Sequence, residues 1–176
     1  PAKLNKRMFP PEGTGPRTRR RNSGRPREKK MDLIETEIPA VRLLVPKKFG
    51  DHRGFFSETY NKRTLSALGI DFDFVQDNHS LSTQVGTVRG LHFQIPPFEQ
   101  TKLIRVTRGA IFDVAVDLRR QSPTYGQWVS AVLSADNWQQ MLIPAGFAHG
   151  LCTLAPDTEV AYKVTNYYAP DGDRGL

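Results

Sequence analysis

Apolar and polar residues alternate with a period of two over most of the chain after residue 31. This is the period of a β-strand with one buried face, because successive side chains of a strand point to opposite sides of the sheet. The clearest case is the segment 110–118. One face carries Ile111, Asp113, Ala115 and Asp117, and the other carries Phe112, Val114, Val116 and Leu118. The two aspartates either pair with Lys or Arg or point outward.

Short segments of this kind follow one another along the chain, separated by turns that contain Gly, Pro and Ser. The expected strands cover 33–38, 55–60, 72–82, 86–94, 101–109, 110–119, 126–134, 139–146, 149–155 and 159–168. One helix is expected over 61–69, where Asn61 can cap the start and Gly69 can end it. Many short strands with hardly any helix indicate an antiparallel β-sandwich or barrel. The sequence contains no βαβ pattern and no GxGxxG, P-loop or GxSxG motif.

Basic side chains are concentrated at the N-terminus, where residues 1–30 hold eleven of the 25 Lys and Arg and two of the 18 Asp and Glu. The other 14 basic and 16 acidic side chains give residues 31–176 a net charge of −2, against +7 for the whole chain. We expect a disordered basic tail, because residues 1–30 have few apolar side chains, followed by one domain over 31–176. The tail is interpreted either as an arm for nucleic acid or as sequence before a natural start at Met31, which we favour. Nucleic acid is therefore not an expected partner of the domain.

The sequence holds a single cysteine, Cys152, which excludes an intrachain disulfide and a cysteine-based zinc site. This fits a reducing compartment. No apolar run approaches the ~20 residues needed to span a bilayer, and the N-terminus lacks the apolar core of a signal peptide. We expect a soluble cytoplasmic protein that does not use the membrane as a partner.

Ionisable residues within apolar strand segments are the candidates for chemistry. His92 and His149 lie in such settings, Lys102 falls in "TKLIRV" and Tyr162 in "AYKVTNYY". Taken singly, each histidine also fits a hydrogen-bonded core residue, and Tyr162 fits an ordinary strand aromatic. Lys102 is more informative, because an inward ammonium in an apolar barrel needs an anion.

Several ordered blocks resemble the dTDP-4-dehydrorhamnose 3,5-epimerase family, from about residue 31 to the last residue. The blocks are "DHRGFFSETYN", "FVQDNHS", "VRGLHFQ", "TKLIRVTRGAIFDVAVDLRRQSPTYGQW", "IPAGFAHG" and "YKVTNYYAPDGDRG". The resemblance implies an all-β, cupin-type jelly roll, a double-stranded antiparallel β-barrel with a short helix, assembled as a homodimer. It implies an isomerase without metal or organic cofactor, which makes the L-rhamnose precursor from a dTDP-linked 4-keto-6-deoxy sugar.

The resemblance also implies roles for individual residues. His92 looks like the general base, Tyr162 like the general acid on the opposite face of the sugar, and Lys102 like the group beside the C4 carbonyl oxygen. The implied substrate contacts are Arg53, Phe56, Glu58, Gln76, Asn78, Arg89, His149, Tyr167 and Asp173.

These residue types suit epimerisation next to a ketone. Removal of a proton alpha to the C4 carbonyl gives an enolate, so the reaction needs a base on one face and a proton donor on the other. The pKa of histidine lies near working pH, and tyrosine stays protonated until the carbanion forms. A lysine ammonium stabilises the enolate oxygen between low-dielectric walls. Arg53 and Arg89 suit a diphosphate by charge and by the geometry of the guanidinium.

A metal site of the cupin type needs two His one residue apart, a nearby Glu and a later His. His149 fits the later position, but Gln94 stands where a second His is wanted after His92, and Glu99 is the only acidic residue nearby. Two His without the other ligands make a poor metal site, so no metal is expected.

Two departures from the family pattern bear on activity. Asp173 stands where the family usually has Glu, and the chain ends at Leu176, before a segment with a Lys and the Asp that orients the catalytic His. We therefore expect a C-terminally incomplete domain with impaired catalysis, in which Asp113 is a candidate substitute partner of His92. The alternatives are an epimerase of one carbon, a ketoisomerase of the same fold, and a non-catalytic cupin-like sugar-nucleotide-binding module.

Overall fold

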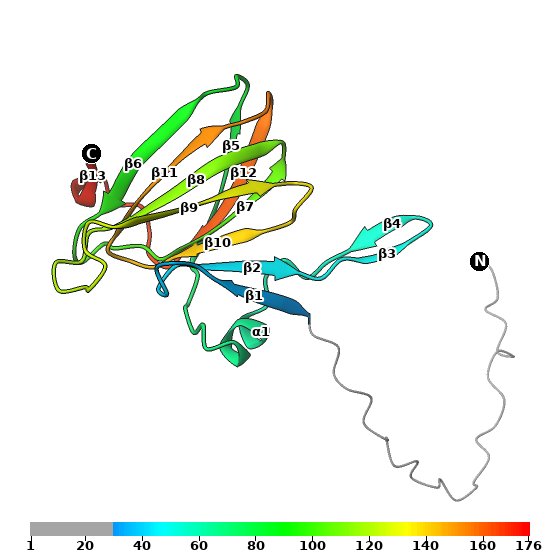
Figure 1. The fold of residues 1–176 in the computed structure, drawn as a ribbon, viewed down its shortest axis with the longest axis horizontal. Coiled ribbons are helices and arrows are strands. Elements are labelled where there is room, and N and C mark those ends of the chain that lie inside the picture. The colour runs from blue at the N-terminus through cyan, green and yellow to red at the C-terminus, as the bar shows by residue number, and fades with distance from the viewer. Residues whose placement is uncertain (1–29) are drawn as a thin grey trace, which may run out of the picture.

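A computed structural model describes residues 30–176, which form two antiparallel sheets packed face to face (Figure 1). The six-stranded sheet has the order β1 (Met31–Glu35), β2 (Arg42–Pro46), β10 (Gln140–Ile143), β7 (Lys102–Arg108), β12 (Thr158–Val164) and β5 (Gln76–Ser82). The five-stranded sheet has the order β13 (Asp173–Gly175), β6 (Val88–Gln94), β11 (Phe147–Thr153), β8 (Ala110–Asp117) and β9 (Trp128–Ser134). The predicted all-β, cupin-type jelly roll is confirmed. The predicted basic tail falls, apart from Lys30, outside the described residues.

The strand β7 shows how alternation builds two cores. Ile104 and Val106 point into the space between the sheets, where they join the main cluster of buried apolar side chains. Leu103 points the other way and packs in a second cluster with Leu65 of helix α1 (Lys62–Ala67). The six-stranded sheet is therefore covered on both faces over part of its area. Burial of apolar surface on both faces, at roughly 25 cal/mol per Å², is the main stabilising term of such a sandwich.

The predicted helix is present but shorter than expected. Asn61 caps it as predicted, because its Oδ1 accepts a hydrogen bond from the backbone N–H of Thr64. The helix ends at Ala67, and Gly69 follows with a φ of +75°, which suits glycine and stops the helical path.

Several strand predictions were wrong in extent, including residues 165–168, and two strands, β2 and the one over residues 49–51, were not predicted. Strand β2 was not predicted, because Leu43 and Leu44 pack into different clusters and the segment lacks alternation. Residues 72–75 and 57–60 were predicted as strand but lie outside any strand. The aromatic Phe72 and Phe74 instead pack against the second cluster, so their spacing reflects contact with α1 rather than a sheet.

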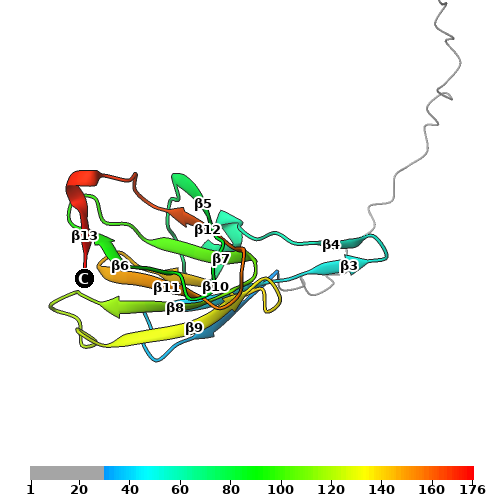
Figure 2. The same ribbon diagram turned by 90° about the horizontal axis from the view of Figure 1, so that it is seen from above.

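A two-stranded hairpin projects from the sandwich. It consists of β3 (Phe49–Asp51) and β4 (Gly54–Phe56), which pair only with each other. In both views the hairpin lies at one end of the long axis, and β13 lies at the other (Figures 1 and 2). The base of the hairpin is held by Trp138, which stacks edge-on with Phe55 at 5.1 Å and donates a hydrogen bond to Ser57. Within residues 30–176 no helix is long and apolar enough to cross a membrane.

Candidate active site

A cavity of about 160 Å³ opens between the two sheets beside β13. It is lined by Gln76, Asn78, His92, Phe93, Gln94, Gln100, Lys102, Tyr162, Tyr168 and Asp173. Six of these are residues that the sequence predicted for the site. A larger cavity of about 270 Å³ lies around Arg105 and Lys163, but it contains neither His92 nor Lys102. We place the candidate site in the smaller cavity, because buried ionisable groups with shifted pKa values meet there.

Glycine at position 90 brings the strand of His92 close to its neighbour. Gly90 has a φ of +107°, and a Cβ there would lie 2.4 Å from the carbonyl oxygen of His149. The pairing of β6 with β11 shifts register just beyond the partners His92 and His149, as at a β-bulge. A β-bulge changes the direction in which side chains point, and only glycine lets the backbone at position 90 come this close to the backbone of His149. The "GLH" segment thus sets where the imidazole of His92 points.

His92 is an uncharged imidazole at neutral pH. Burial lowers its pKa to about 4, and the positive charges of Lys102 and His149 act in the same direction, against a smaller opposite effect of Asp173. The ring centroids of His92 and His149 lie 5.6 Å apart in an edge-to-face arrangement. Among residues 30–176 no carboxylate hydrogen-bonds to His92. A neutral imidazole is the form that can accept a proton.

Lys102 is a buried ammonium without a close anion. Its side chain is buried, and no hydrogen bond or ion pair of its Nζ occurs within the described part of the chain. Burial lowers the pKa of Lys102 to about 8, while the charges of Asp173 and Asp113 oppose this effect. Taking an ammonium out of water costs several kcal/mol, so the position calls for an anionic partner.

Tyr162 faces the cavity from the sheet opposite to His92. It lies on β12 of the six-stranded sheet, and His92 lies on β6 of the five-stranded sheet. Burial raises the pKa of Tyr162, with a smaller opposite effect of Arg89, so the phenol stays protonated at neutral pH. A base and a proton donor therefore enter one cavity from two different sheets.

Asp113 does not take the position expected of it. Its Oδ1 accepts a hydrogen bond of 2.7 Å from Nε2 of His149, not from His92. Both residues are buried. Asp113 and Asp117 lie on one face of β8 and are both buried. The predicted pairing with Lys or Arg is confirmed for Asp117, which pairs with Arg119, but neither expected alternative holds for Asp113.

The C-terminal segment closes one side of the cavity through contacts that the sequence did not reveal. The Gln94 amide donates to the carbonyls of Phe98 and Tyr167, and its Oε1 accepts from the N–H of Ala169. Tyr168 lines the cavity, and its hydroxyl lies 3.5 Å from Asp173. Tyr168 was missed because "NYY" offers two adjacent tyrosines. Tyr167, the one predicted, is exposed and does not line the cavity.

Five other predicted residues lie outside the cavity lining, and one of them is His149. Arg89 is held by hydrogen bonds to Ser82 Oγ and to the carbonyl of Leu81. Three residues lie in or just after the hairpin: Arg53, Phe56 and Glu58. Arg53 pairs with Asp51, Phe56 is exposed, and Glu58 pairs with Lys30 at 2.9 Å. Because the hairpin lies at the other end of the long axis, one chain does not bring these three to the cavity (Figure 2).

The described residues 30–176 contain no group of three or more His, Cys, Asp or Glu side chains that could hold a metal ion. His92 and His149 come close together, but Gln94 is used to hold the C-terminal segment. The donor set of this cavity therefore suits proton transfer better than metal ligation.

Comparison with known proteins gives a consistent result. The family model described as dTDP-4-dehydrorhamnose 3,5-epimerase matches residues 35–176. A protein of that name from Sinorhizobium fredii is 58% identical over 139 residues, which are 79% of this chain and 71% of the relative. A crystal structure of such an enzyme from Bacillus anthracis with TDP and PPi bound is 57% identical and has a TM-score of 0.81. The match covers 83% of each chain.

The Legionella pneumophila epimerase in complex with dTDP-4-keto-L-rhamnose is 47% identical with a TM-score of 0.78, over 83% of this chain and 77% of that one. The chain therefore belongs to the dTDP-4-dehydrorhamnose 3,5-epimerase family.

Proposed function

We propose that this isomerase inverts C3 and C5 of dTDP-4-dehydro-6-deoxy-D-glucose to give dTDP-4-dehydro-L-rhamnose. The observation that carries the proposal is the meeting, in one cavity, of an uncharged His92, a protonated Tyr162 and an unpaired Lys102. The nucleotide and sugar nucleotide in the Bacillus and Legionella structures support a dTDP-linked 4-keto sugar as the substrate of this chain. The cytoplasmic location and the absence of a nucleic-acid partner stay predictions.

The chemistry follows from the two opposed sheets. His92 takes the proton from the carbon next to the C4 ketone, and the electron pair moves onto the C4 oxygen. Lys102 donates to this oxygen and stabilises the enolate, which is most effective in a water-poor cavity. Tyr162 then protonates the same carbon from the other face and inverts it. The imidazolium loses its proton to solvent and the tyrosinate regains one, so each cycle is redox-neutral and needs no cofactor.

Polar side chains around the cavity suit the rest of the substrate. The Gln76 amide donates to Asn78 at 2.8 Å, which fixes both amides side by side on β5. Arg89 lies on β6, the strand of His92, and His149 faces His92 from the neighbouring strand β11. We assign the thymidine to the amide side and the diphosphate to Arg89, because a guanidinium matches phosphate oxygens in charge and geometry.

We further propose that the protein acts as a homodimer in which each hairpin completes the cavity of the other subunit. Arg53 and Phe56 are exposed on a projecting hairpin that is remote from the cavity of its own chain. A two-fold interface repeats every contact, so two such hairpins can be exchanged at once. Phe56 would then stack on the base, and Arg53 would reach the diphosphate.

Mixed dimers test the exchanged hairpins. The Arg53→Ala and His92→Ala variants each lose activity when assayed alone, because every site contains one defect. Random mixing after dissociation places both defects in one site of each mixed dimer and leaves its other site intact, which restores about a quarter of the wild-type activity. No recovery in verified mixed dimers would show that each site is built from one chain.

Proton exchange with solvent tests the function itself. In deuterated water the sugar nucleotide should gain deuterium at both C3 and C5 and be converted to the L-configured product. Label at one carbon only would support the single-carbon epimerase. Tight dTDP binding without label at either carbon would support the non-catalytic binding module. Conversion to a 3-keto sugar would support the ketoisomerase.

A further inference from the structure

Strand β8 carries two buried aspartates on the same face, four residues apart. Asp113 and Asp117 have no exposed surface. At the strand rise of about 3.3 Å per residue they are separated by roughly 13 Å. They therefore share strand, face and burial, and they differ in what surrounds the carboxylate.

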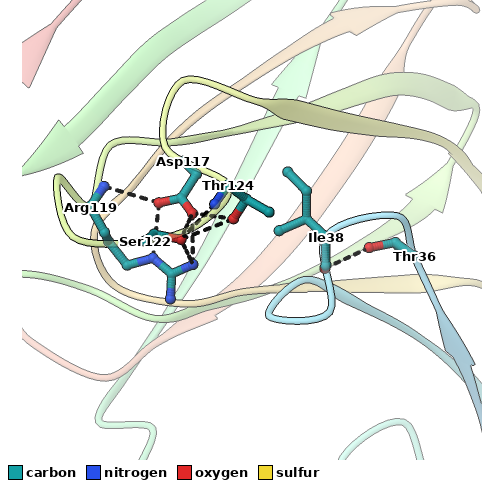
Figure 3. Close-up of polar contacts among 6 residues, drawn as sticks. All are labelled: Thr36, Ile38, Asp117, Arg119, Ser122 and Thr124. Carbon is teal, nitrogen blue, oxygen red and sulfur yellow. Dashed lines mark hydrogen bonds and ion pairs between the residues drawn. The ribbon is translucent and has the colours of Figure 1, made fainter.

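Asp117 has a complete set of partners in the loop that follows β8 (Figure 3). Its two oxygens accept five hydrogen bonds, three from the backbone and guanidinium of Arg119 and one each from Ser122 and Thr124. The Arg119 guanidinium is the first cause that lowers the pKa of Asp117. This carboxylate closes a loop, and none of its partners lines the candidate active site.

Asp113 is only half satisfied. Oδ1 accepts the hydrogen bond from His149 at 2.7 Å, whereas Oδ2 is buried and has no partner among residues 30–176. Nδ1 of His149 is also buried without a partner there. Leaving a buried polar atom unpaired costs about 1–3 kcal/mol, and more for a charged one. A carboxylate that served packing alone would be paired as Asp117 is.

The proposed base of the cavity, His92, lies next to this pair. The His149 ring packs edge-to-face on the His92 ring, and the two residues face each other across β11 and β6. The negative charge of Asp113 also acts on the Lys102 ammonium, which has no ion pair in the described part of the chain. One carboxylate thus influences the base through His149 and the ammonium through space.

We propose that Asp113 is a positioning residue for the epimerisation, which holds His149 against the imidazole of His92. This inference rests on the proposed function. Asp113 touches neither the substrate nor the reacting atoms, and acts on the base only through His149.

Two acids act on Lys102, and the effect of Asp173 is the larger one. His92 repels the ammonium when protonated, Tyr162 is neutral, and Arg89 carries the same sign. Asp173 lies on the exposed strand β13 at the cavity edge, whereas Asp113 is buried. Water screens an exposed charge more than a buried one.

The substitution Asp113→Asn tests the proposal, with Asp117→Asn as the matched control. We expect kcat of Asp113→Asn to fall about 10- to 100-fold, the usual range for loss of an outer partner of a working group. The dTDP affinity should change less than about twofold, because the nucleotide is bound elsewhere. The alkaline limb of the kcat/KM profile should move to lower pH, because Lys102 loses its proton more easily without Asp113. Asp117→Asn should lower the melting temperature but leave kcat and the pH profile of the folded protein unchanged.

A second variant keeps the test decisive if Asp113→Asn does not fold. His149→Asn breaks the contact with His92 but leaves the charge of Asp113, so kcat should fall while the alkaline limb stays in place. Wild-type kcat and pH profile in Asp113→Asn, or wild-type kcat in a folded His149→Asn, would overturn the proposal. Absence of epimerisation by the wild-type protein would instead overturn the proposed function, so the two failures are distinguishable.

Discussion

The two ends of β8 treat buried charge in opposite ways. At the loop end, the carboxylate of Asp117 accepts five hydrogen bonds and is neutralised by Arg119. At the cavity end, Lys102 has no close anion in the described chain, and Asp113 has one oxygen unpaired. A fully paired buried charge contributes to stability. A buried charge whose hydrogen bonds are not all made costs stability and is found mainly at functional sites. The difference separates residues of the scaffold from residues of the reaction.

The largest effect is expected at the base. His92→Ala should lower kcat/KM by about 10²- to 10⁴-fold, the usual contribution of a general base. Its melting temperature should stay close to wild type, because the imidazole makes no hydrogen bond in the described structure. His79→Ala is the control, since His79 is exposed and pairs with Glu159 at 3.1 Å. Retention of most activity by His92→Ala would remove it as the base.

Lys102→Met should separate activity from stability most clearly. Loss of the ammonium should lower kcat by about 10²- to 10³-fold, as for other groups that stabilise an oxyanion. The same substitution should raise the free energy of unfolding by about 1–4 kcal/mol, because an apolar side chain of similar length replaces a poorly paired buried charge. Kinetics and urea unfolding of one preparation measure both. A destabilised Lys102→Met would show that the ammonium is paired in solution.

Asp117→Asn should show the reverse behaviour with a smaller effect. The free energy of unfolding should fall by about 1–3 kcal/mol, because Arg119, Ser122 and Thr124 lose a charged acceptor, with solvent screening of the partly exposed Arg119 limiting the loss. The kcat per folded molecule should stay within about twofold, since the loop is not part of the cavity. Urea unfolding and kinetics at low temperature check both values. A large loss of kcat in fully folded protein would mean that the two ends of β8 are coupled.

The local pattern predicted the scaffold well where one strand face is buried. Alternation placed Ile111, Asp113, Ala115 and Asp117 on one face of β8, and all four are buried. It failed for β2, where both faces are apolar, and for Phe72 and Phe74, whose spacing mimics a strand. Period-two reasoning detects a difference between faces, so a segment without that difference carries no signal.

The candidate site was predictable only in part. His92, Lys102 and Tyr162 were found as ionisable residues in apolar strands that match family motifs, and the structure places all three in one cavity. Asp113 and His149 are 36 residues apart in the sequence, on β8 and β11, so no local pattern could reveal their hydrogen bond. The hairpin that carries Arg53 is remote from the cavity because of the direction in which it projects from the sandwich. The residues of the hairpin alone do not predict this direction.

The pH dependence of kcat/KM tests most directly whether burial sets the charge states at the cavity end. His92 must be neutral to accept a proton and is neutral above its pKa of about 4, whereas Lys102 must be charged and stays charged below its pKa of about 8. The profile should therefore be level between these values and fall on both sides, because it reports the ionisations of the free enzyme. Limbs near the ordinary values of 6.5 and 10.5 would contradict the account, since they would show a base and an ammonium that burial does not perturb.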